Sequence, residues 1–312
     1  MEVRKVKRVI SAVLALCSVW VLAAGCAENK PSQTLSIGVL PDVDSIPIII
    51  AQEKGFFEKE GVDVTIEHFK SAPDRESALQ AGSIDGAVSD MLSAAFLTEG
   101  GFKVAMTSMT NGSYKLLAGP SMTGSTDLTD KSIAISTNTI IEYTTDKMVT
   151  ELGLTPEDVK KTAIPQIPVR LEMLKSGQID AATLPEPLAS TAVKAGAAVL
   201  GSTDSLGINP GVLLFTSEVI ESKSAEIAAF YRAYNSAVDY LQSAPVSDYV
   251  DILIEAAGFP EDIKEQLSLP TYTKAALPSA DDFDGVMTWL TQKGLIKSAY
   301  QYDDLVSKSF VK

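Results

Sequence analysis

The sequence has little of the chemistry on which enzymes usually depend. Its 312 residues include one histidine, His68, and two cysteines, Cys17 and Cys26. No H-E-x-x-H, G-x-S-x-G or G-x-x-x-x-G-K motif occurs. Both cysteines lie in the N-terminal segment considered below, so cysteine catalysis and thiolate metal sites are excluded. A lone histidine identifies no catalytic partner, and we assign His68 a structural or surface role. We therefore expect no enzyme activity, no metal site and no cofactor.

Positive charge is also scarce. Lys and Arg number 26 against 40 Asp and Glu, which gives a formal net charge of −14. Nucleic-acid binding requires a basic face that neutralises phosphates, so a nucleic-acid partner is excluded. A hydrophobic content of 46% is ordinary for a globular protein, and the length allows two compact lobes.

The N-terminus has the parts of an export signal. A basic stretch, "MEVRKVKR", precedes an apolar run from Val9 to Gly25 that ends in "VLAAGC". At about 17 residues this run is short for a membrane-spanning helix. It resembles a bacterial lipoprotein signal, which implies cleavage of residues 1–25 and acylation of Cys26. Residues 26–34 then form a tether, and the protein is expected to be extracytoplasmic and lipid-anchored to the cell membrane.

The rest of the chain repeats itself. From Leu35 onward, short apolar β-rich runs alternate with helical patterns, which is typical of parallel α/β units. A first set contains "PDRESALQAGSIDGAVSD" (73–90) and a second "PVRLEMLKSGQIDAATLPEP" (168–187), with matching positions 95 apart. The order of strands and helices around them also matches, including one predicted helix over 46–61. The repeat predicts an α/β fold of two βαβ lobes.

The C-terminal part departs from this pattern. It contains one isolated strand pattern, "GVLLFTS" (211–217), followed by predicted helices over 222–243, 246–257, 261–268 and 279–293. We expect this helical segment to return to the first lobe and cover it. The chain then crosses between lobes near 112–120 and 203–212, forming a two-strand hinge. Lobe 1 accordingly comprises 35–115 and 205–312, lobe 2 comprises 116–204, and a monomer is expected.

Loops at the carboxyl ends of the strands should face the cleft between the lobes, where ligands bind in open α/β sheets. Glu186 is notable because Pro185 and Pro187 fix the backbone around it. Plain helix capping and solvated loop charges are the alternatives for these loops. Asp85 and Asp180 are interpreted as capping residues, and Arg75 and Arg170 as serving the repeated fold. The candidate ligand-binding residues are Asp42, Asp44, Ser45, Ser71, Ser89, Asp90, Ser136, Thr137, Asn138, Thr139, Gln166 and Glu186.

Several of these stretches carry a family resemblance. The opening "GVLPDVDSIPIIIAQEKGFFEKEGVDVTIEHF", the later "LKSGQIDAATLPEP" and the ending "LTQKGLIKSAYQYDDLVSKSF" are similar to one group of proteins. That group is the substrate-binding proteins of ABC importers for sulfonates, taurine, nitrate and thiamine-precursor pyrimidines. The resemblance implies a type II periplasmic-binding-protein fold and delivery of a small molecule to ABC permease subunits.

The ligand class remains open at this point. The predicted cleft loops carry several acids and only one base, Lys70, which favours a neutral or cationic nitrogen-bearing solute such as a pyrimidine. The alternative is a sulfonate- or nitrate-type anion, because helix N-termini alone can bind anions. Two further alternatives are an enzyme like the pyrimidine synthases and a receptor-linked sensor module.

Overall fold

The computed structural model describes residues 34–122, 127–265, 267 and 269–311. The predicted signal peptide, the predicted acylation site Cys26 and all but the last residue of the predicted tether lie outside the described residues. Among the residues described, no helix is long and apolar enough to cross a membrane.

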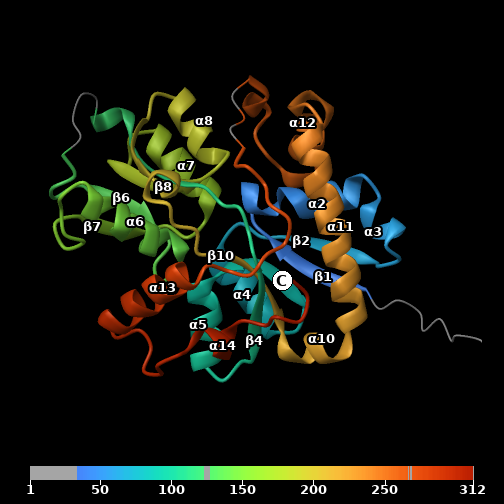
Figure 1. Ribbon diagram of the computed structural model, residues 1–312. Helices are drawn as coiled ribbons and strands as arrows, with labels where there is room; N and C mark the ends of the chain where they lie inside the picture. The colour runs from blue at the N-terminus through green and yellow to red at the C-terminus, as the bar shows by residue number, and fades with distance from the viewer. Residues whose placement is uncertain (1–33, 123–126, 266, 268, 312) are drawn as a thin grey trace, which may run out of the picture. The chain divides into compact units, whose positions relative to one another are not determined.

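Two five-stranded sheets form the framework (Figure 1). The strand order is β2-β1-β3-β10-β4 in the first sheet and β7-β6-β8-β5-β9 in the second. Each has a parallel part plus one antiparallel strand: β10 pairs with β3 and β4, and β5 pairs with β8 and β9. The strands are β1 (Leu35–Val39), β2 (Val64–His68), β3 (Gly86–Asp90), β4 (Val104–Met109), β5 (Tyr114–Ala118), β6 (Ser132–Ile135), β7 (Lys160–Ala163), β8 (Ala181–Pro185), β9 (Ala198–Ser202) and β10 (Gly211–Thr216).

Most of the helices that follow the strands occupy equivalent positions in the two lobes. In the first lobe these are α2 (Ile46–Glu53), α3 (Phe56–Lys59), α4 (Ala72–Gln80) and α5 (Met91–Glu99). In the second they are α6 (Ile140–Glu151), α7 (Ile167–Lys175), α8 (Leu188–Lys194) and α9 (Thr203–Leu206). The two predicted lobes and their repeated helix–strand order are confirmed, whereas the exact domain boundaries stay predictions.

Two local expectations were wrong. The helix predicted over 46–61 is two helices, because Gly55 between them adopts a left-handed conformation (φ 68°) that ends the first. Tyr114–Ala118, which we assigned to a chain crossing, is the strand β5 inside the second sheet. The strand predicted at "GVLLFTS" is present as β10, which lies between β3 and β4. The segments that join the sheets are therefore 110–113 and 203–210.

The C-terminal segment packs mainly on the first lobe. Helices α11 and α12 lie on α2, and α13 lies on α5. The remaining elements after β10 are α10 (Ser217–Ser222), α11 (Ser224–Ser243), η3 (Val246–Asp248), α12 (Val250–Ala257), η4 (Glu261–Glu265), α13 (Ala280–Gln292) and α14 (Tyr302–Leu305). The expected helix at 261–268 is the short 3-10 helix η4.

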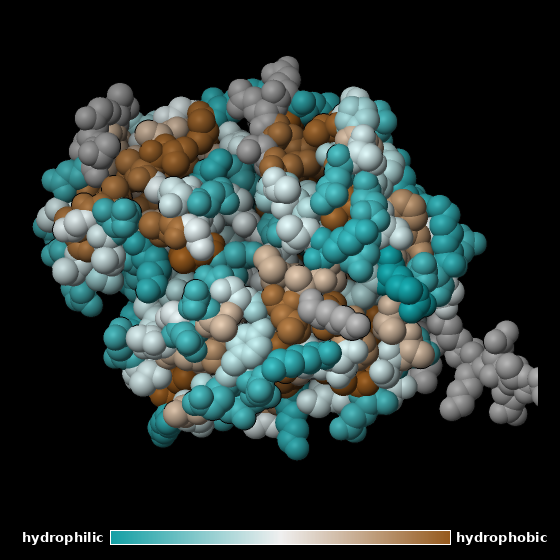
Figure 2. Space-filling view, viewed as in Figure 1, coloured by the Kyte–Doolittle hydropathy of each residue, from teal (hydrophilic) through white to brown (hydrophobic). Residues whose placement is uncertain are grey.

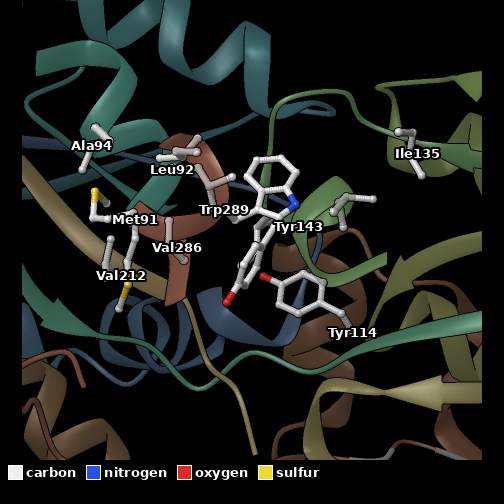
Figure 3. Packing of buried hydrophobic residues seen from close by; sticks show 14 of the residues in the cluster. Met91, Leu92, Ala94, Tyr114, Ile135, Tyr143, Val212, Val286 and Trp289 are labelled. Atoms are coloured by element: carbon white, nitrogen blue, oxygen red, sulfur yellow. The ribbon is translucent and has the colours of Figure 1, made fainter. Parts of the chain in front are cut away.

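One apolar cluster continues from the first lobe into the second. It joins α5 and α13 to β5, β6 and α6. In Figure 3, Trp289 of α13 lies beside Tyr143 of α6, with their ring centroids 5.7 Å apart in an edge-to-face arrangement. Tyr114 of β5 belongs to the same cluster. The two lobes are thus packed together on one side by α13.

Ion pairs reinforce this contact. Lys293, at the end of α13, bonds the carboxylates of Glu142 (2.6 Å) and Asp146 (3.2 Å) of α6, both of which are buried. Trp289 donates its indole N–H to Asp146 (3.1 Å). Lys161 of β7 pairs with the same two acids. We call Glu142, Asp146, Lys161, Trp289 and Lys293 the outer interlobe contact.

The surface in Figure 2 is mostly a mixture of polar and apolar residues, with apolar side chains gathered over α7 and α8. Val169 of α7 and Val193 of α8 are exposed there at 42% and 39%. Scattered exposed apolar residues are normal on a folded protein.

Candidate functional site

A small cavity lies between the two sheets. Residues of both lobes line it, and the volume open to the centre of a water molecule is about 30 Å³. That is room for about two waters, or for a correspondingly small solute. The lining residues are Leu40, Asp42, Asp44, Ala72, Arg75, Val88, Ser89, Asp90, Tyr114, Ser136, Thr139, Ile140, Ile141, Pro165, Ile167, Arg170 and Pro185.

The first-lobe wall of the cavity begins with two carboxylates. Asp42 and Asp44 follow β1 and are 4% and 2% exposed. Ser45 donates to Asp42 (2.9 Å), while Thr110 (2.5 Å) and Tyr114 (3.1 Å) donate to Asp44. Burial raises the pKa of both acids, and the neighbouring Asp44 raises that of Asp42 further.

A third carboxylate, Asp90, ends β3 and caps α5. Its Oδ1 accepts the backbone N–H of Ser93 at 2.7 Å, which is the usual role of an N-cap aspartate. The residue is 1% exposed. Burial, and next the charge of Glu76, raise the pKa of Asp90.

Arg75 of α4 is the base on this wall, and it is surrounded by partners. Its guanidinium donates to the carbonyl of Val88, to Ser89 and to Glu76, which is 2.6 Å away. Ser89 in turn donates to Glu76 (2.8 Å). Burial acts to lower the pKa of Arg75, but the charges of Glu76, Asp90 and Asp42 outweigh it, so the pKa is raised. The positive charge of Arg75 is therefore balanced by neighbouring carboxylates.

The second-lobe wall carries a hydroxyl and a helix N-terminus. Ser136 follows β6, and Thr139 caps α6 by accepting the N–H of Ile141 (3.2 Å) while donating to the carbonyl of Ser136 (2.8 Å). The hydroxyl of Ser136 is buried and has no hydrogen-bond partner among the described residues. A hydroxyl without a hydrogen-bond partner, beside the positive end of a helix dipole, can donate to a negatively charged acceptor.

Arg170 of α7 is the one guanidinium on that wall. It is 0% exposed, and its Nη1 donates to the carbonyls of Ile164 (2.9 Å) and Pro165 (3.2 Å). Its Nε and Nη2 have no partner, and no carboxylate of the described residues pairs with it. Burial alone lowers the pKa of Arg170 to about 9, so the group is still charged at neutral pH. This buried positive charge is uncompensated.

The twelve candidate residues from the sequence divide evenly. Asp42, Asp44, Ser89, Asp90, Ser136 and Thr139 line the cavity. Thr137 and Asn138 are exposed and line a neighbouring hollow between α4, α5 and the start of α6. The other four have different surroundings: Ser45 bonds Asp42, Ser71 caps α4, Gln166 is at the start of α7, and Glu186 is considered next.

Glu186 lies outside the residues that line the cavity. Its carboxylate pairs with Lys115 and accepts from the N–H and hydroxyl of Ser190, both at 3.0 Å. Its backbone carbonyl accepts from Val43 of the first lobe (2.9 Å). The proline-flanked segment thus joins β8 to the first lobe. A direct contact of Glu186 with ligand remains an untested prediction.

The sequence interpretation missed three lining residues that carry polar groups: Tyr114, Arg75 and Arg170. Both arginines lie near the N-terminus of a helix, where a positive charge opposes the helix dipole. An arginine placed against the dipole near the start of a helix that follows a strand was the available signal. Among the described residues, no group of three or more His, Cys, Asp or Glu could hold a metal ion.

With this geometry in place, comparisons with known proteins decide the family. The model of the NMT1-like family matches residues 28–250. The chain belongs to the NMT1-like family. This confirms at family level the predicted resemblance to substrate-binding proteins of ABC importers.

Individual relatives agree with this membership of the NMT1-like family. A putative ABC transporter periplasmic binding protein of Brachyspira hyodysenteriae is 23% identical over 264 residues, covering 78% of this chain and 76% of that protein. The ligand-binding component of an ABC-type import system from Staphylococcus aureus, solved with zinc bound, has a TM-score of 0.77 at 17% identity, covering 89% of this chain and 98% of that one.

A second solved structure extends the comparison of the fold. The alkanesulfonate-binding protein SsuA from Xanthomonas axonopodis pv. citri, bound to MOPS, has a TM-score of 0.74 at 18% identity, covering 88% of this chain and 98% of that one. The predicted type II periplasmic-binding-protein fold is confirmed. All three proteins are named as binding proteins or ligand-binding components, not as enzymes.

Proposed function

We propose that this protein is an extracytoplasmic solute-binding lipoprotein that captures a small molecule bearing an anionic group and delivers it to an ABC permease. The observation that supports an anionic group on the ligand is the buried guanidinium of Arg170, which has no acidic partner. A buried guanidinium without a counter-charge costs several kcal/mol relative to one in water, and buried charges of this kind are concentrated at functional sites. A bound anion compensates it.

The surroundings of Arg170 support the same ligand chemistry. The unpartnered hydroxyl of Ser136 and the first residues of α6, Ile140 and Ile141, line the same cavity. A guanidinium, a hydroxyl and a helix N-terminus together supply donors to an acid group from several directions. The acidic loops had favoured a nitrogen-bearing solute such as a pyrimidine, but Arg170 favours the anion alternative. A relative named for binding alkanesulfonates is consistent with that choice.

Binding of a test anion examines this assignment directly. The mature protein is titrated calorimetrically with acetate, methanesulfonate and inorganic phosphate, and native mass spectrometry identifies any co-purified solute. We expect an acid-bearing solute to bind and Arg170→Met to weaken its affinity about tenfold or more, the cost of a lost charge-assisted hydrogen bond. Arg232→Met is the control, because Arg232 is 57% exposed by its side chain and pairs with Glu60 away from the cavity. Unchanged affinity in Arg170→Met contradicts the proposal.

The membrane attachment is tested separately. Cleavage before Cys26 and acylation of its thiol would leave the binding domain on a short tether at the membrane. We expect Cys26→Ser to release the protein from the membrane fraction, with ligand binding unchanged. Mass spectrometry of the membrane-extracted protein should show acyl chains on Cys26. An unmodified, membrane-free wild-type protein contradicts the anchor.

A further inference from the structure

The two segments that join the sheets, 110–113 and 203–210, are bonded to each other at Thr110. The backbone N–H of Thr110 donates to the carbonyl of Gly211 at 3.1 Å, and its carbonyl accepts the side-chain amide of Asn209 at 2.5 Å. Thr110 is 0% exposed, so water does not compete for these bonds. The two segments therefore form one bonded unit at this point, and this unit is the hinge between the lobes.

The carboxylate of Asp44 lies against this hinge. It accepts the hydroxyl of Thr110 at 2.5 Å and the phenol of Tyr114, the first residue of β5, at 3.1 Å. These two donors stand at the two ends of the segment 110–113, so one carboxylate holds both ends. Asp44 belongs to the first lobe and is 2% exposed, whereas Tyr114 begins a strand of the second sheet. The bond between them therefore links the lobes at the hinge itself.

Two glycines leave the space that this carboxylate occupies. A Cβ on Gly112 would lie 2.5 Å and 2.8 Å from the two oxygens of Asp44. A Cβ on Gly211 would lie 3.0 Å from one of these oxygens and would also meet the hydroxyl of Thr110. Neither glycine has a φ in the left-handed region, so backbone conformation does not require glycine at either position. The close approach of Asp44 does.

We propose that Asp44 is a positioning residue that couples the cavity to the hinge. Its carboxylate lines the cavity, and by holding Thr110 and Tyr114 it keeps the joining segments in the arrangement that closes the lobes over Arg170. The inference rests on the proposed function, because it concerns how the geometry of that site is maintained. Since the lobes move about the hinge, a displacement of this carboxylate shifts the more distant parts of the lobes further.

Direct contact with the ligand is a different role for Asp44, and it predicts the opposite effect on affinity. A carboxylate repels the acid group that Arg170 is proposed to bind, so its removal would strengthen anion binding if Asp44 acted on the ligand alone. Loss of a hinge contact instead lowers the population of the closed form, and the apparent affinity falls in proportion. Gly112 and Gly211 do not line the cavity, so substitutions there test the hinge role alone.

The main test is Gly112→Ala, which displaces the carboxylate without removing its charge. Nitroxide labels on cysteines introduced at the exposed Ser77 of α4 and Ser176 at the end of α7 report the separation of the lobes. The parent is the mature, ligand-free Cys26→Ser protein, in which the labelled cysteines are the only ones. We expect one narrow, short distance in the parent and longer, broader distances with Gly112→Ala or Gly211→Ala. Parent-like distances in both variants overturn the proposal.

The control is Gly100→Ala at the end of α5. Its Cβ would lie 3.4 Å from the nearest carbonyl oxygens, which is an ordinary contact, so the label distance should not change. If the glycine variants do not fold, Tyr114→Phe serves instead, because it removes only the donor from the second lobe. It should also broaden the label distances, and a parent-like distribution in that variant contradicts the proposal.

A double variant shows whether the effect passes through Asp44. Asp44→Ala alone should open the lobes. In that background a methyl group at position 112 has no carboxylate to displace, so adding Gly112→Ala should change the label distances no further. Further opening in the double variant means that Gly112 acts on the hinge by another route and overturns the proposed role of Asp44.

Titration calorimetry with acetate, methanesulfonate and inorganic phosphate relates the hinge to binding. For a probe that binds the wild type, we expect Gly112→Ala to weaken the affinity about tenfold, in step with a tenfold smaller closed fraction. Unchanged affinity in a protein whose lobes have opened overturns the coupling to the cavity. If none of the three probes binds the wild type, the result counts against the proposed function, whereas the label distances decide the role of Asp44 without any ligand.

Discussion

Arg75 and Arg170 occupy the same position in the two copies of the repeated helix, yet their surroundings are opposite. Both are buried and both donate to backbone carbonyls. Arg75 has Glu76 at 2.6 Å and further acids nearby, whereas Arg170 has no acid at all among the described residues. The comparison shows that a repeat can preserve a residue while changing its task. The first arginine is neutralised within the protein, and under the proposed function the second is neutralised by a ligand.

The largest expected effect is the difference in folding stability between the Arg75→Met and Arg170→Met variants. Arg75→Met removes the only base among four carboxylates and should lower the free energy of unfolding by about 3–5 kcal/mol. Arg170→Met removes an uncompensated charge, so the ligand-free protein should lose at most about 1 kcal/mol or become more stable. Urea denaturation of both ligand-free variants measures the difference. Equal losses would mean that Arg170 is structural, as the sequence first suggested.

A second prediction concerns the carboxylates of α6 that form ion pairs with a lysine of α13. Lys293 of α13 is paired with Glu142 and Asp146, unlike the acids of the cavity. Lys293→Met should cost about 2 kcal/mol, because two buried carboxylates lose one of their two lysines. Small-angle X-ray scattering should show a more open ligand-free protein. Lys297→Met, on an exposed neighbour beyond the helix, is the control. Unchanged scattering would show that the outer interlobe contact does not hold the lobes together.

A third prediction concerns the hydrogen bond that the second sheet donates to the buried carboxylate of Asp44. Tyr114 of β5 donates to Asp44 across the interlobe boundary, whereas Thr110 donates to it from the end of β4. Tyr114→Phe should lower the free energy of unfolding by about 1 kcal/mol, since one of the two side-chain donors to a buried carboxylate is lost. Thr110→Val provides the matched loss on the other side. Differential scanning calorimetry measures both, and no change in either would mean that Asp44 does not depend on these donors.

The smallest effect concerns Asp85 and Asp180, a pair that has the same role in both lobes. Each accepts the N–H of a residue in the adjacent first strand, Ser36 and Ser132 respectively. The N–H of Ser132 is the main cause that lowers the pKa of Asp180. A lowered folded pKa means that the stabilisation is present above about pH 4 and is lost as the pH falls through the folded pKa.

Asp180→Asn should therefore cost under about 1 kcal/mol at neutral pH and nothing near pH 2, with the small size set by solvent screening. Denaturation across this pH range measures it. A cost that stays constant with pH would mean that hydrogen-bond geometry, and not ionisation, is responsible. Asp85→Asn should cost more at neutral pH, because Lys223 then loses its partner at 2.8 Å.

The fold could be predicted from the sequence because the repeated motifs correspond directly to repeated helix–strand units. The alternation of strands and helices and the 95-residue offset predicted two lobes, and half of the candidate residues reached the cavity since strand ends meet at one edge of a sheet. Arg170 was missed because a repeated residue looks structural until its partners are known. Glu186 was chosen for its prolines, but whether a loop carboxylate faces a cleft or a lysine depends on packing that local sequence does not contain.

The place of β10 also determines the order in which the lobes can form. All the strands of the second sheet lie between Tyr114 and Ser202, so that sheet can assemble from one continuous stretch of chain. The first sheet needs β10 between β3 and β4, and its centre stays incomplete until residues 211–216 arrive. Contacts so distant in sequence form slowly. The lobe that presents Arg170 can therefore fold before the lobe that presents the aspartates.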